Sequence, residues 1–451
     1  MTRRGPRRTV RLGAGAGFAG DRIDPALDLA RRGDLDYLVF ECLGERTIAA
    51  GQLRRLRDPA SGYDPLLGAR LAAVLPHCQR SGTAVVTNAG AAHPEAAGDL
   101  ARRLVRDLGL PGPRVAVVTG DDVLDAVRRL DPLVWETGAP VSAAAEELIS
   151  ANAYLGAEAV TEALELGAGL VVAGRVADPS LYLGPLMHAF GWRPSQHEVL
   201  GRGTMVGHLL ECAGQLTGGY FADPVTKPVP AMARLGFPYA DVGPDGTAVF
   251  GKLAGTGGRL DERTCAEQLL YEVDDPTAYV TPDVVADLSR VTFTQLAADR
   301  VEARGAIGRP RPDQLKVTLG FRGGWLGEGQ ISYAGPRCRE RARLAGDIVR
   351  ERLASVHGLD TAAVHVEHIG AAAAFRGLVD VPDPAEVRLR VTARVPTADD
   401  AELVGWEVES LYTNGPAGGG GARRDTHEVL TVRSCLIPRD LVTPTATLLE
   451  P

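Results

Sequence analysis

The sequence predicts an α/β fold, with a mostly parallel sheet in the N-terminal region and a second, α+β domain after it. Short apolar runs alternate with amphipathic stretches from the N-terminus onward, which is typical of a parallel α/β sheet. Beyond residue 312 the order changes to ββαββαβ, which contains the split βαβ signature. The length of 451 residues fits two or three domains at about 150 residues each.

The expected elements of the N-terminal region are short. Its strands are apolar runs at 8–13, 35–41, 83–88, 114–119 and 168–174. Its helices are expected at 65–79, 95–108, 155–166, 179–190 and 203–214. Asp178-Pro179 is a typical helix start, and residues 237–252 predict two short strands around a Pro-Asp-Gly turn.

The C-terminal pattern predicts a separate domain. Its strands are expected at 315–321, 328–333, 363–368, 386–394 and 428–436, and its helices at 336–354 and 398–412. We place the boundary within about 280–312, which gives an α/β domain at 1–300 and a second domain at 301–451.

Composition and charge exclude several classes of protein. The net charge is −8, so binding to nucleic acid is not expected. No apolar stretch approaches the roughly 18 residues of a membrane span, and Arg11 interrupts the apolar run that a signal peptide needs. We expect a cytoplasmic protein that binds no membrane.

The first glycine-rich stretch, at 12–22, contains Gly15-x-Gly17-x-x-Gly20 after a predicted strand. This spacing imitates a dinucleotide fingerprint, but Asp24-Pro25 indicates a helix that starts beyond the glycines. We therefore interpret residues 13–20, with Gly13, Gly15 and Gly17, as a backbone cradle for an anionic or amide group. A tight turn is the simpler alternative.

Polar residues end or closely follow four of the predicted strands. They include Glu41, Asn88, Asp121 and the pair Arg175 and Asp178. Because ligands bind at the carboxyl ends of parallel strands, we expect these residues to share a cleft, although each could instead cap a helix or form a salt bridge.

Three other residues could carry chemistry. Asn152 precedes a predicted helix, as a cap or as an amide ligand to a carbonyl group. His208 and Glu211 are three residues apart on a predicted helix, so they share a face and could pair an acid with a base or hold a metal ion. A satisfied buried pair is the alternative.

Two further glycine-rich segments could bind an anion. Lys252 precedes Gly255-Thr256-Gly257-Gly258, and lysine otherwise occurs only at 227 and 316. The run with Gly418, Gly419 and Gly420 precedes Arg423, so it could bring backbone N–H groups and a guanidinium group to a phosphate or carboxylate. A flexible connection is the alternative for the second segment.

Eight motifs spread through the chain resemble recurrent blocks of the AtuA family, named for acyclic terpene utilization. They are LGAGAGFAGDR (12–22), YLVFECLGERT (37–47), TNAGAAHP (87–94), NAYLGAEAV (152–160), GRVADPSLYLGPL (174–186), GTMVGHLLECAGQLTGGYF (203–221), GTGG (255–258) and LYTNGPAGGGGARR (411–424). The resemblance implies a pathway that degrades branched acyl-CoA thioesters. It also implies an α/β N-terminal region and a ferredoxin-like C-terminal domain, and it transfers no catalytic residues.

The leading hypothesis is an enzyme that acts on a branched carboxylic acid or its CoA thioester, by proton abstraction with lyase or hydratase chemistry. The roles would be Glu41 as general base, Asn88 and Asn152 on a carbonyl, Asp178 and Arg175 on the acyl group or its carboxylate, and His208 with Glu211 as acid or metal ligands.

Two other classes stay open. One is a non-catalytic subunit or binding module of a carboxylase or reductase complex, suggested by the expected second domain. The other is an NAD(P)-dependent oxidoreductase, suggested by the glycine spacing. We also expect a homo-oligomer, and we leave open whether a metal ion binds.

Overall fold

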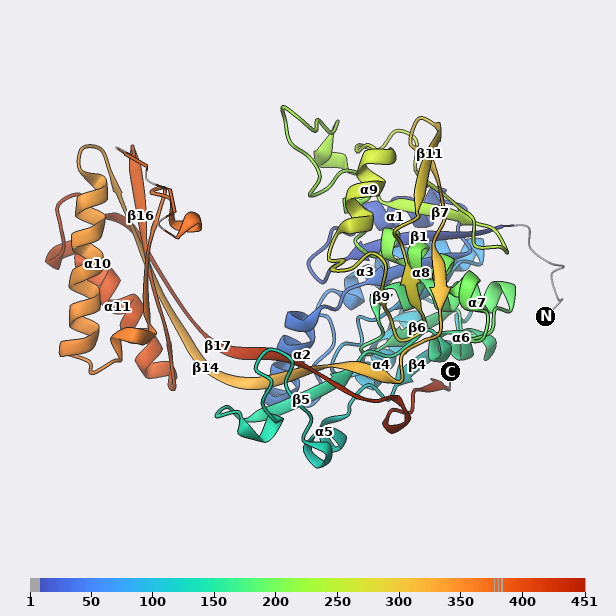
Figure 1. Cartoon of the computed structure of the whole chain (residues 1–451), viewed down its shortest axis with the longest axis horizontal. Coiled ribbons are helices and arrows are strands. Elements are labelled where there is room, and N and C mark those ends of the chain that lie inside the picture. The colour runs from blue at the N-terminus through green and yellow to red at the C-terminus, as the bar shows by residue number, and fades with distance from the viewer. Residues whose placement is uncertain (1–8, 377, 380, 383, 451) are drawn as a thin grey trace. The chain divides into compact units, whose positions relative to one another are not determined.

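The computed structural model describes residues 9–376, 378–379, 381–382 and 384–450, and these form two compact units (Figure 1). The first unit contains the chain up to Gly320 and again from Val432, and the second is Phe321–Thr431. The predicted division at 300/301 differs from this one, because residues 301–320 and 432–450 belong to the first unit. The reason is that two long strands, β14 (Gln314–Ala334) and β17 (Gly420–Pro438), each supply residues to both units.

The first unit is organised around a mixed sheet with the strand order β11-β12-β8-β7-β1-β2-β3-β6-β4-β18. Its strands are β1 (Val10–Gly17), β2 (Tyr37–Glu41), β3 (Ala84–Thr87), β4 (Val115–Thr119), β6 (Leu170–Ala173), β7 (Pro238–Val242), β8 (Ala248–Lys252), β11 (Thr292–Ala297), β12 (Arg300–Arg304) and β18 (Thr445–Leu448). The run β1-β2-β3-β6-β4 is parallel and the flanking pairs are antiparallel. The predicted α/β class with parallel strands is confirmed.

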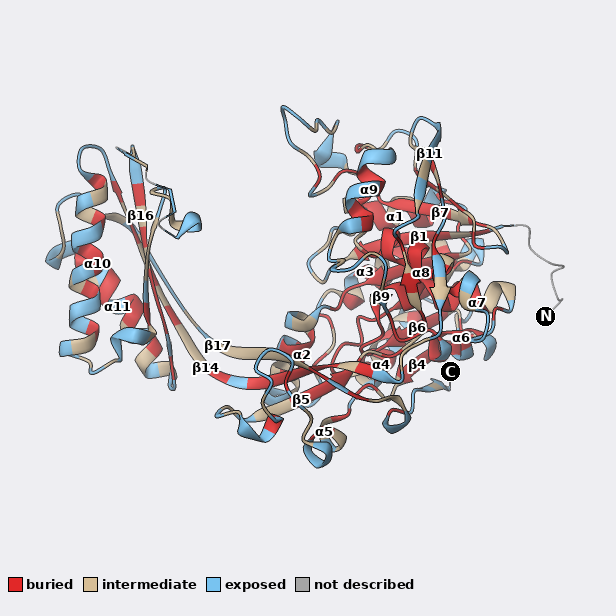
Figure 2. Ribbon diagram, in the orientation of Figure 1, coloured by how far each residue is buried: buried red, intermediate tan, exposed pale blue. Residues whose placement is uncertain are grey.

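The helices of the first unit come from several parts of the chain, and most of them pack on this sheet. They are α1 (Asp24–Arg32), α2 (Glu45–Arg57), α3 (Leu67–Ser81), α4 (Pro94–Asp107), α5 (Leu124–Leu130), α6 (Glu158–Glu165), α7 (Asp178–Phe190), α8 (His197–Glu211) and α9 (Glu262–Leu270). Strands β2 and β6 are buried along their whole length, and Figure 2 shows the interior of this unit in red. Burial on both faces explains why these strands are continuous apolar runs in the sequence.

Four further strands complete the first unit. β5 (Leu148–Ala153) pairs with β14, and β9 (Tyr279–Val280), β10 (Val285–Asp287) and β13 (Ile307–Arg309) form a small antiparallel sheet.

The second unit has the element order βαββαβ. Between β14 and β17 lie α10 (Cys338–Ser355), β15 (Val364–Ile369), β16 (Glu386–Val395) and α11 (Ala398–Asn414), and the sheet order is β15-β16-β14-β17. Both helices cover the same face of this sheet (Figure 1). Their apolar side chains and those of the strands form one buried core.

Three local expectations are wrong. The strands expected at 315–321 and 328–333 are one strand, because Gly323 and Gly324 continue β14 where a side chain at either position would strike the neighbouring strands. The cradle expected at 13–20 is largely strand, since β1 extends to Gly17. Asn152 lies in β5 and does not cap α6, which starts at Glu158.

Among the described residues, no helix is both long enough and apolar enough to cross a membrane.

Candidate functional site

A cavity of about 720 Å³ lies in the first unit, where β1 and β2 end and where α7 begins and α8 ends. We call it the acid cavity, because its lining includes Asp21, Glu41, Glu45, Asp178, Glu211 and Glu272. Its apolar lining includes Phe18, Leu43, Met232, Leu235 and Phe237. The volume lies within the usual range for small-molecule sites, about 300–1,000 Å³.

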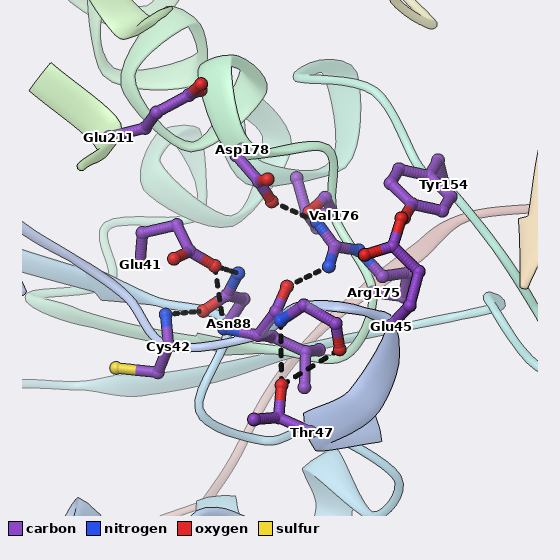
Figure 3. Close-up of polar contacts among 12 residues, drawn as sticks. Glu41, Cys42, Glu45, Thr47, Asn88, Tyr154, Arg175, Val176, Asp178 and Glu211 are labelled. Atoms are coloured by element: carbon purple, nitrogen blue, oxygen red, sulfur yellow. Dashed lines mark hydrogen bonds and ion pairs between the residues drawn. The ribbon is translucent and has the colours of Figure 1, made fainter. Parts of the chain in front are cut away.

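Glu41 is the last residue of β2 and is fixed by neutral donors. The backbone N–H of Leu43 (2.6 Å) and Nδ2 of Asn88 (3.0 Å) both donate to Oε1 of Glu41 (Figure 3). Oδ1 of Asn88 in turn accepts from the backbone N–H of Cys42 at 2.7 Å. Both ends of the Asn88 amide are therefore used, so Asn88 orients Glu41 and is not free to polarise a substrate carbonyl.

The surroundings keep Glu41 protonated to an unusually high pH. Burial and the nearby Asp178 carboxylate raise its pKa to about 8, and Arg175 and Asn88 only partly oppose this. Glu41 therefore changes its protonation state close to neutral pH.

Arg175 is fully buried and is occupied by the protein itself. Its guanidinium group donates to the carbonyl oxygens of Leu43 and Val176 and forms an ion pair with Asp178 (Figure 3). Its Cζ also lies 4.3 Å from the centre of the Tyr154 ring. Arg175 therefore holds Asp178 at the edge of the acid cavity, and it does not line the cavity as a partner for a substrate carboxylate.

His208 and Glu211 form a buried pair on α8. Nε2 of His208 lies 3.0 Å from the carbonyl oxygen of Leu269, which can only accept, so Nε2 carries a proton. Nδ1 lies 2.9 Å from Oε1 of Glu211, so these two atoms share one further proton or separate it as an ion pair. Oε2 of Glu211 has no hydrogen-bond partner within the described chain, although it is buried.

The same pair titrates near neutral pH. Burial raises the pKa of Glu211 to about 7 against the opposing effect of His208. Burial lowers the pKa of His208, but Glu211 outweighs it and the net shift is upward. Because both ring nitrogens already have protein partners, His208 cannot ligate a metal ion as it stands. The described residues also contain no group of three or more His, Cys, Asp or Glu side chains placed to hold one.

Glu45, Tyr154 and Lys316 form a second polar network beside the acid cavity. The Tyr154 hydroxyl (2.5 Å) and Nζ of Lys316 (2.9 Å) both donate to Oε1 of Glu45. Burial raises the pKa of Glu45, but Lys316 and Tyr154 outweigh it and hold the pKa at about 2. The rare lysine at 316 thus neutralises a carboxylate at the cavity wall.

Several predicted site residues lie elsewhere in the first unit. Gly13 and Gly15 are inside β1, where a side chain would strike Leu35 or Phe40, so they serve strand packing. Gly17 does line the cavity, but its N–H donates to Asp21 (2.9 Å), which leaves no open cradle.

Asn152 and Lys252 are also engaged away from the acid cavity. Asn152 accepts from Gln52 (3.0 Å) and donates to Asp121 (2.8 Å). Lys252 pairs with Asp299 at 3.1 Å.

The remaining predicted residues, Gly418, Gly419, Gly420 and Arg423, belong to the second unit. There, Gly420 is the first residue of β17, and a side chain at Gly419 would crowd Ile331 and Tyr333. The glycine run therefore includes the start of a strand, and Arg423 is an exposed residue of that strand.

Sequence reasoning missed part of the cavity lining. Gln215, Tyr220, Tyr271 and Glu272 lie in segments without helical or strand periodicity, so no pattern identified them. The only available signal was the motif that continues from α8 to residue 221.

The structure is that of an α/β protein with a cavity lined by carboxyl groups, two of which have raised pKa values near neutral pH. The chain belongs to the acyclic terpene utilisation family AtuA, whose model matches residues 10–448. The match confirms the family resemblance that the motifs indicated. Comparisons with curated proteins and with solved structures gave no match.

Proposed function

We propose that this protein is an enzyme that acts on a branched acyl-CoA thioester or the corresponding carboxylic acid, by proton abstraction with lyase or hydratase chemistry. The observation that carries the proposal is the acid cavity, in which Glu41 and the His208–Glu211 pair both titrate near neutral pH. General acid–base catalysis is most efficient when the pKa of the catalytic group lies near the working pH.

Each group would have one role in a dehydration. Glu41 takes the proton from the carbon next to the carbonyl group, and the C–H electrons form the new double bond. The hydroxyl group on the next carbon leaves as water with a proton from the His208–Glu211 pair. Hydration is the reverse. In a C–C lyase reaction, the base takes the proton of the 3-hydroxyl group and the O–H electrons form a new carbonyl group as the bond between the second and third carbons breaks. The acid then gives a proton to the second carbon.

The remaining predicted residues would position these groups. Asn88 orients Glu41 through the hydrogen bond to Oε1. Arg175 fixes Asp178, whose charge raises the pKa of Glu41 and so makes it a stronger base.

Membership of the acyclic terpene utilisation family supports the substrate class. Acyclic terpene skeletons carry methyl branches, and the degradation of such chains passes through branched acyl intermediates. We therefore place the protein in acyclic terpenoid or branched-acyl metabolism.

Deuterium exchange tests the proposal without knowledge of the complete reaction. The purified protein is incubated in D₂O with a panel of branched 3-hydroxyacyl and enoyl thioesters and their free acids. Mass spectrometry should show deuterium entering the carbon next to the carbonyl group, with the parent protein and not with Glu41→Gln. No exchange with any member of the panel would overturn the proposal.

A non-catalytic subunit of a carboxylase or reductase complex is the second candidate. It is supported by the second unit, whose order βαββαβ and strand order β15-β16-β14-β17 lead us to propose a ferredoxin-like domain, a common association surface. Native mass spectrometry of protein purified from its own cells separates the two. A stoichiometric foreign subunit would favour this candidate, and the homo-oligomer that we expect would count against it.

A further inference from the structure

A second cavity, of about 770 Å³, lies in the first unit beside the acid cavity. We call it the apolar cavity, because most of its lining is apolar or aromatic. These side chains are Trp135, Tyr154, Ala177, Pro179, Tyr279, Val280, Pro282, Pro312, Leu315 and Leu436. No step of the proposed reaction uses them.

The two cavities adjoin. Glu45, Asp178 and Glu272 line both of them, so a molecule in the acid cavity can extend past these three residues into the apolar cavity. Two of the three carboxylates are paired, Glu45 with Lys316 and Asp178 with Arg175. A hydrocarbon chain beside these residues therefore lies next to fewer unpaired charges than it would beside three unpaired carboxylates.

The apolar cavity leaves large apolar side chains open to solvent. The exposed fraction is 68% for Trp135 and 61% for Val280, and Leu436 is also exposed. The backbone at Trp135 is held by a hydrogen bond from its N–H to the carbonyl oxygen of Ser434 at 2.8 Å. Exposed apolar side chains that gather around a preformed hollow are typical of a site that a ligand covers.

We propose that the apolar cavity binds the hydrocarbon end of a medium-length acyl substrate, while its carbonyl end lies in the acid cavity. This inference rests on the proposed function, since it takes the acyl carbonyl to lie near Glu41. It makes Trp135, Val280 and Leu436 the residues that select for chain length. A short acyl group would fill only the acid cavity and would gain nothing from them.

Trp135 provides a direct readout of binding. The other tryptophans, at 192, 325 and 406, lie outside both cavity linings. Decanoate should shift the fluorescence of the protein to shorter wavelength in a saturable way, because a hydrocarbon chain removes water from the indole ring. Butyrate should give no shift and should bind at least tenfold more weakly by calorimetry.

Two matched valine variants locate the chain. Val280→Asp should weaken decanoate binding at least tenfold, whereas Val225→Asp should leave it unchanged. Val225 is 88% exposed and lines neither cavity. Trp135→Phe should lose the fluorescence shift and keep binding in calorimetry, which shows that the signal comes from this residue. Circular dichroism and the melting temperature establish that each variant is folded.

Three outcomes would overturn the inference. They are equal affinity for decanoate and butyrate, unchanged decanoate binding by Val280→Asp, and a Trp135 signal with CoA alone, which would assign the apolar cavity to pantetheine. The proposed function fails separately. If no substrate exchanges deuterium while decanoate binding still depends on chain length and on Val280, the hydrocarbon site stands without the catalytic role of Glu41.

Discussion

Glu41 in the first unit and Glu407 in the second are both buried glutamates, yet their pKa values shift in opposite directions. The side chain of Glu407 accepts from Nε (2.7 Å) and Nη2 (3.0 Å) of Arg352 and contacts Nε2 of His357 at 2.6 Å. Burial raises its pKa, but Arg352 and His357 outweigh burial and the net shift is downward. The two donors that reach Glu41 in the described part of the chain are neutral, and Asp178 lies nearby.

The comparison separates a structural carboxylate from one suited to proton transfer. Burial alone penalises the charge of both side chains, and their partners decide the direction of the net pKa shift. Glu407 pairs with the Arg352 cation of α10 and contacts His357 in the turn after α10, so it stays charged and ties α11 to both. Glu41 is oriented by neutral donors that do not cancel its charge, and burial and Asp178 raise its pKa to about 8. It also lines a cavity.

The largest expected effect is the loss of proton transfer in Glu41→Gln. Glutamine keeps the shape of the side chain and can still accept from Leu43 and Asn88, but it cannot take a proton. The rate of deuterium exchange should fall roughly 10²- to 10⁴-fold, the usual contribution of a general base. The melting temperature should not fall, because an unpaired buried acid is removed. Undiminished exchange by this variant would show that Glu41 is not the base.

Glu407→Gln should give the converse result. The variant removes the negative charge to which Arg352 and His357 are bound, which should lower the free energy of unfolding by about 1–3 kcal/mol. The loss is limited because Arg352 is partly exposed to solvent. Urea denaturation measures this loss, and hydrogen exchange of the backbone amides shows whether it is located in α11. Deuterium exchange into substrate should stay at the parent rate at a temperature where the variant is folded, and a loss of that rate would break the distinction between the two glutamates.

The sequence predicted the arrangement best where periodicity and strand ends were informative. Buried apolar runs identified β2 and β6. Glu41, which ends β2, and Asp178, which follows β6, do meet at the acid cavity. The spacing of His208 and Glu211 correctly indicated that the two side chains face each other. These are local properties, which a single sequence carries.

Other predictions depended on partners that the sequence does not reveal. Arg175 and Asn152 also follow or end apolar runs, but their polar groups form hydrogen bonds within the protein. Arg175 bonds to Leu43 and Asn152 bonds to Gln52, and both partners are distant in the sequence. Gly13 and Gly15 are small because Leu35 and Phe40 fill the space beside β1, not because a ligand approaches. Only the fold distinguishes a polar residue that faces a cavity from one that is satisfied inside the protein.

Asn88 and Asn152 sharpen the comparison as a pair of buried amides. Asn88→Ala removes a hydrogen bond that lowers the pKa of Glu41, so the rate of exchange should begin to change at a pH above 8. The rate itself should fall by about tenfold because Asn88 no longer orients Glu41. Asn152→Ala removes the hydrogen bonds of Asn152 to Asp121 and Gln52, and Asp121 keeps the hydrogen bond from the backbone N–H of Arg175. It should reduce stability without changing the pH dependence of exchange. The profile of deuterium exchange against pH measures both, and equal profiles for the two variants would remove the positioning role of Asn88.

The pH dependence of stability should also distinguish the two glutamates, because each should affect the free energy of unfolding in its own pH window. The pKa of Glu41 is about 8 in the folded protein against an ordinary 4.5, so the folded state holds more protons between these values. The free energy of unfolding should therefore fall as the pH rises from about 4.5 to 8, by at most about 1.4 kcal/mol per pH unit from this residue. Glu407 has a lowered pKa, so its contribution is present above about 4.5 and is lost as the pH falls through its folded pKa. Glu41→Gln should flatten the decline above pH 5, and Glu407→Gln should flatten the decline at acid pH. Denaturant titrations from pH 3 to 8 test both, and a Glu41→Gln variant with the parent's slope at neutral pH would contradict the raised pKa.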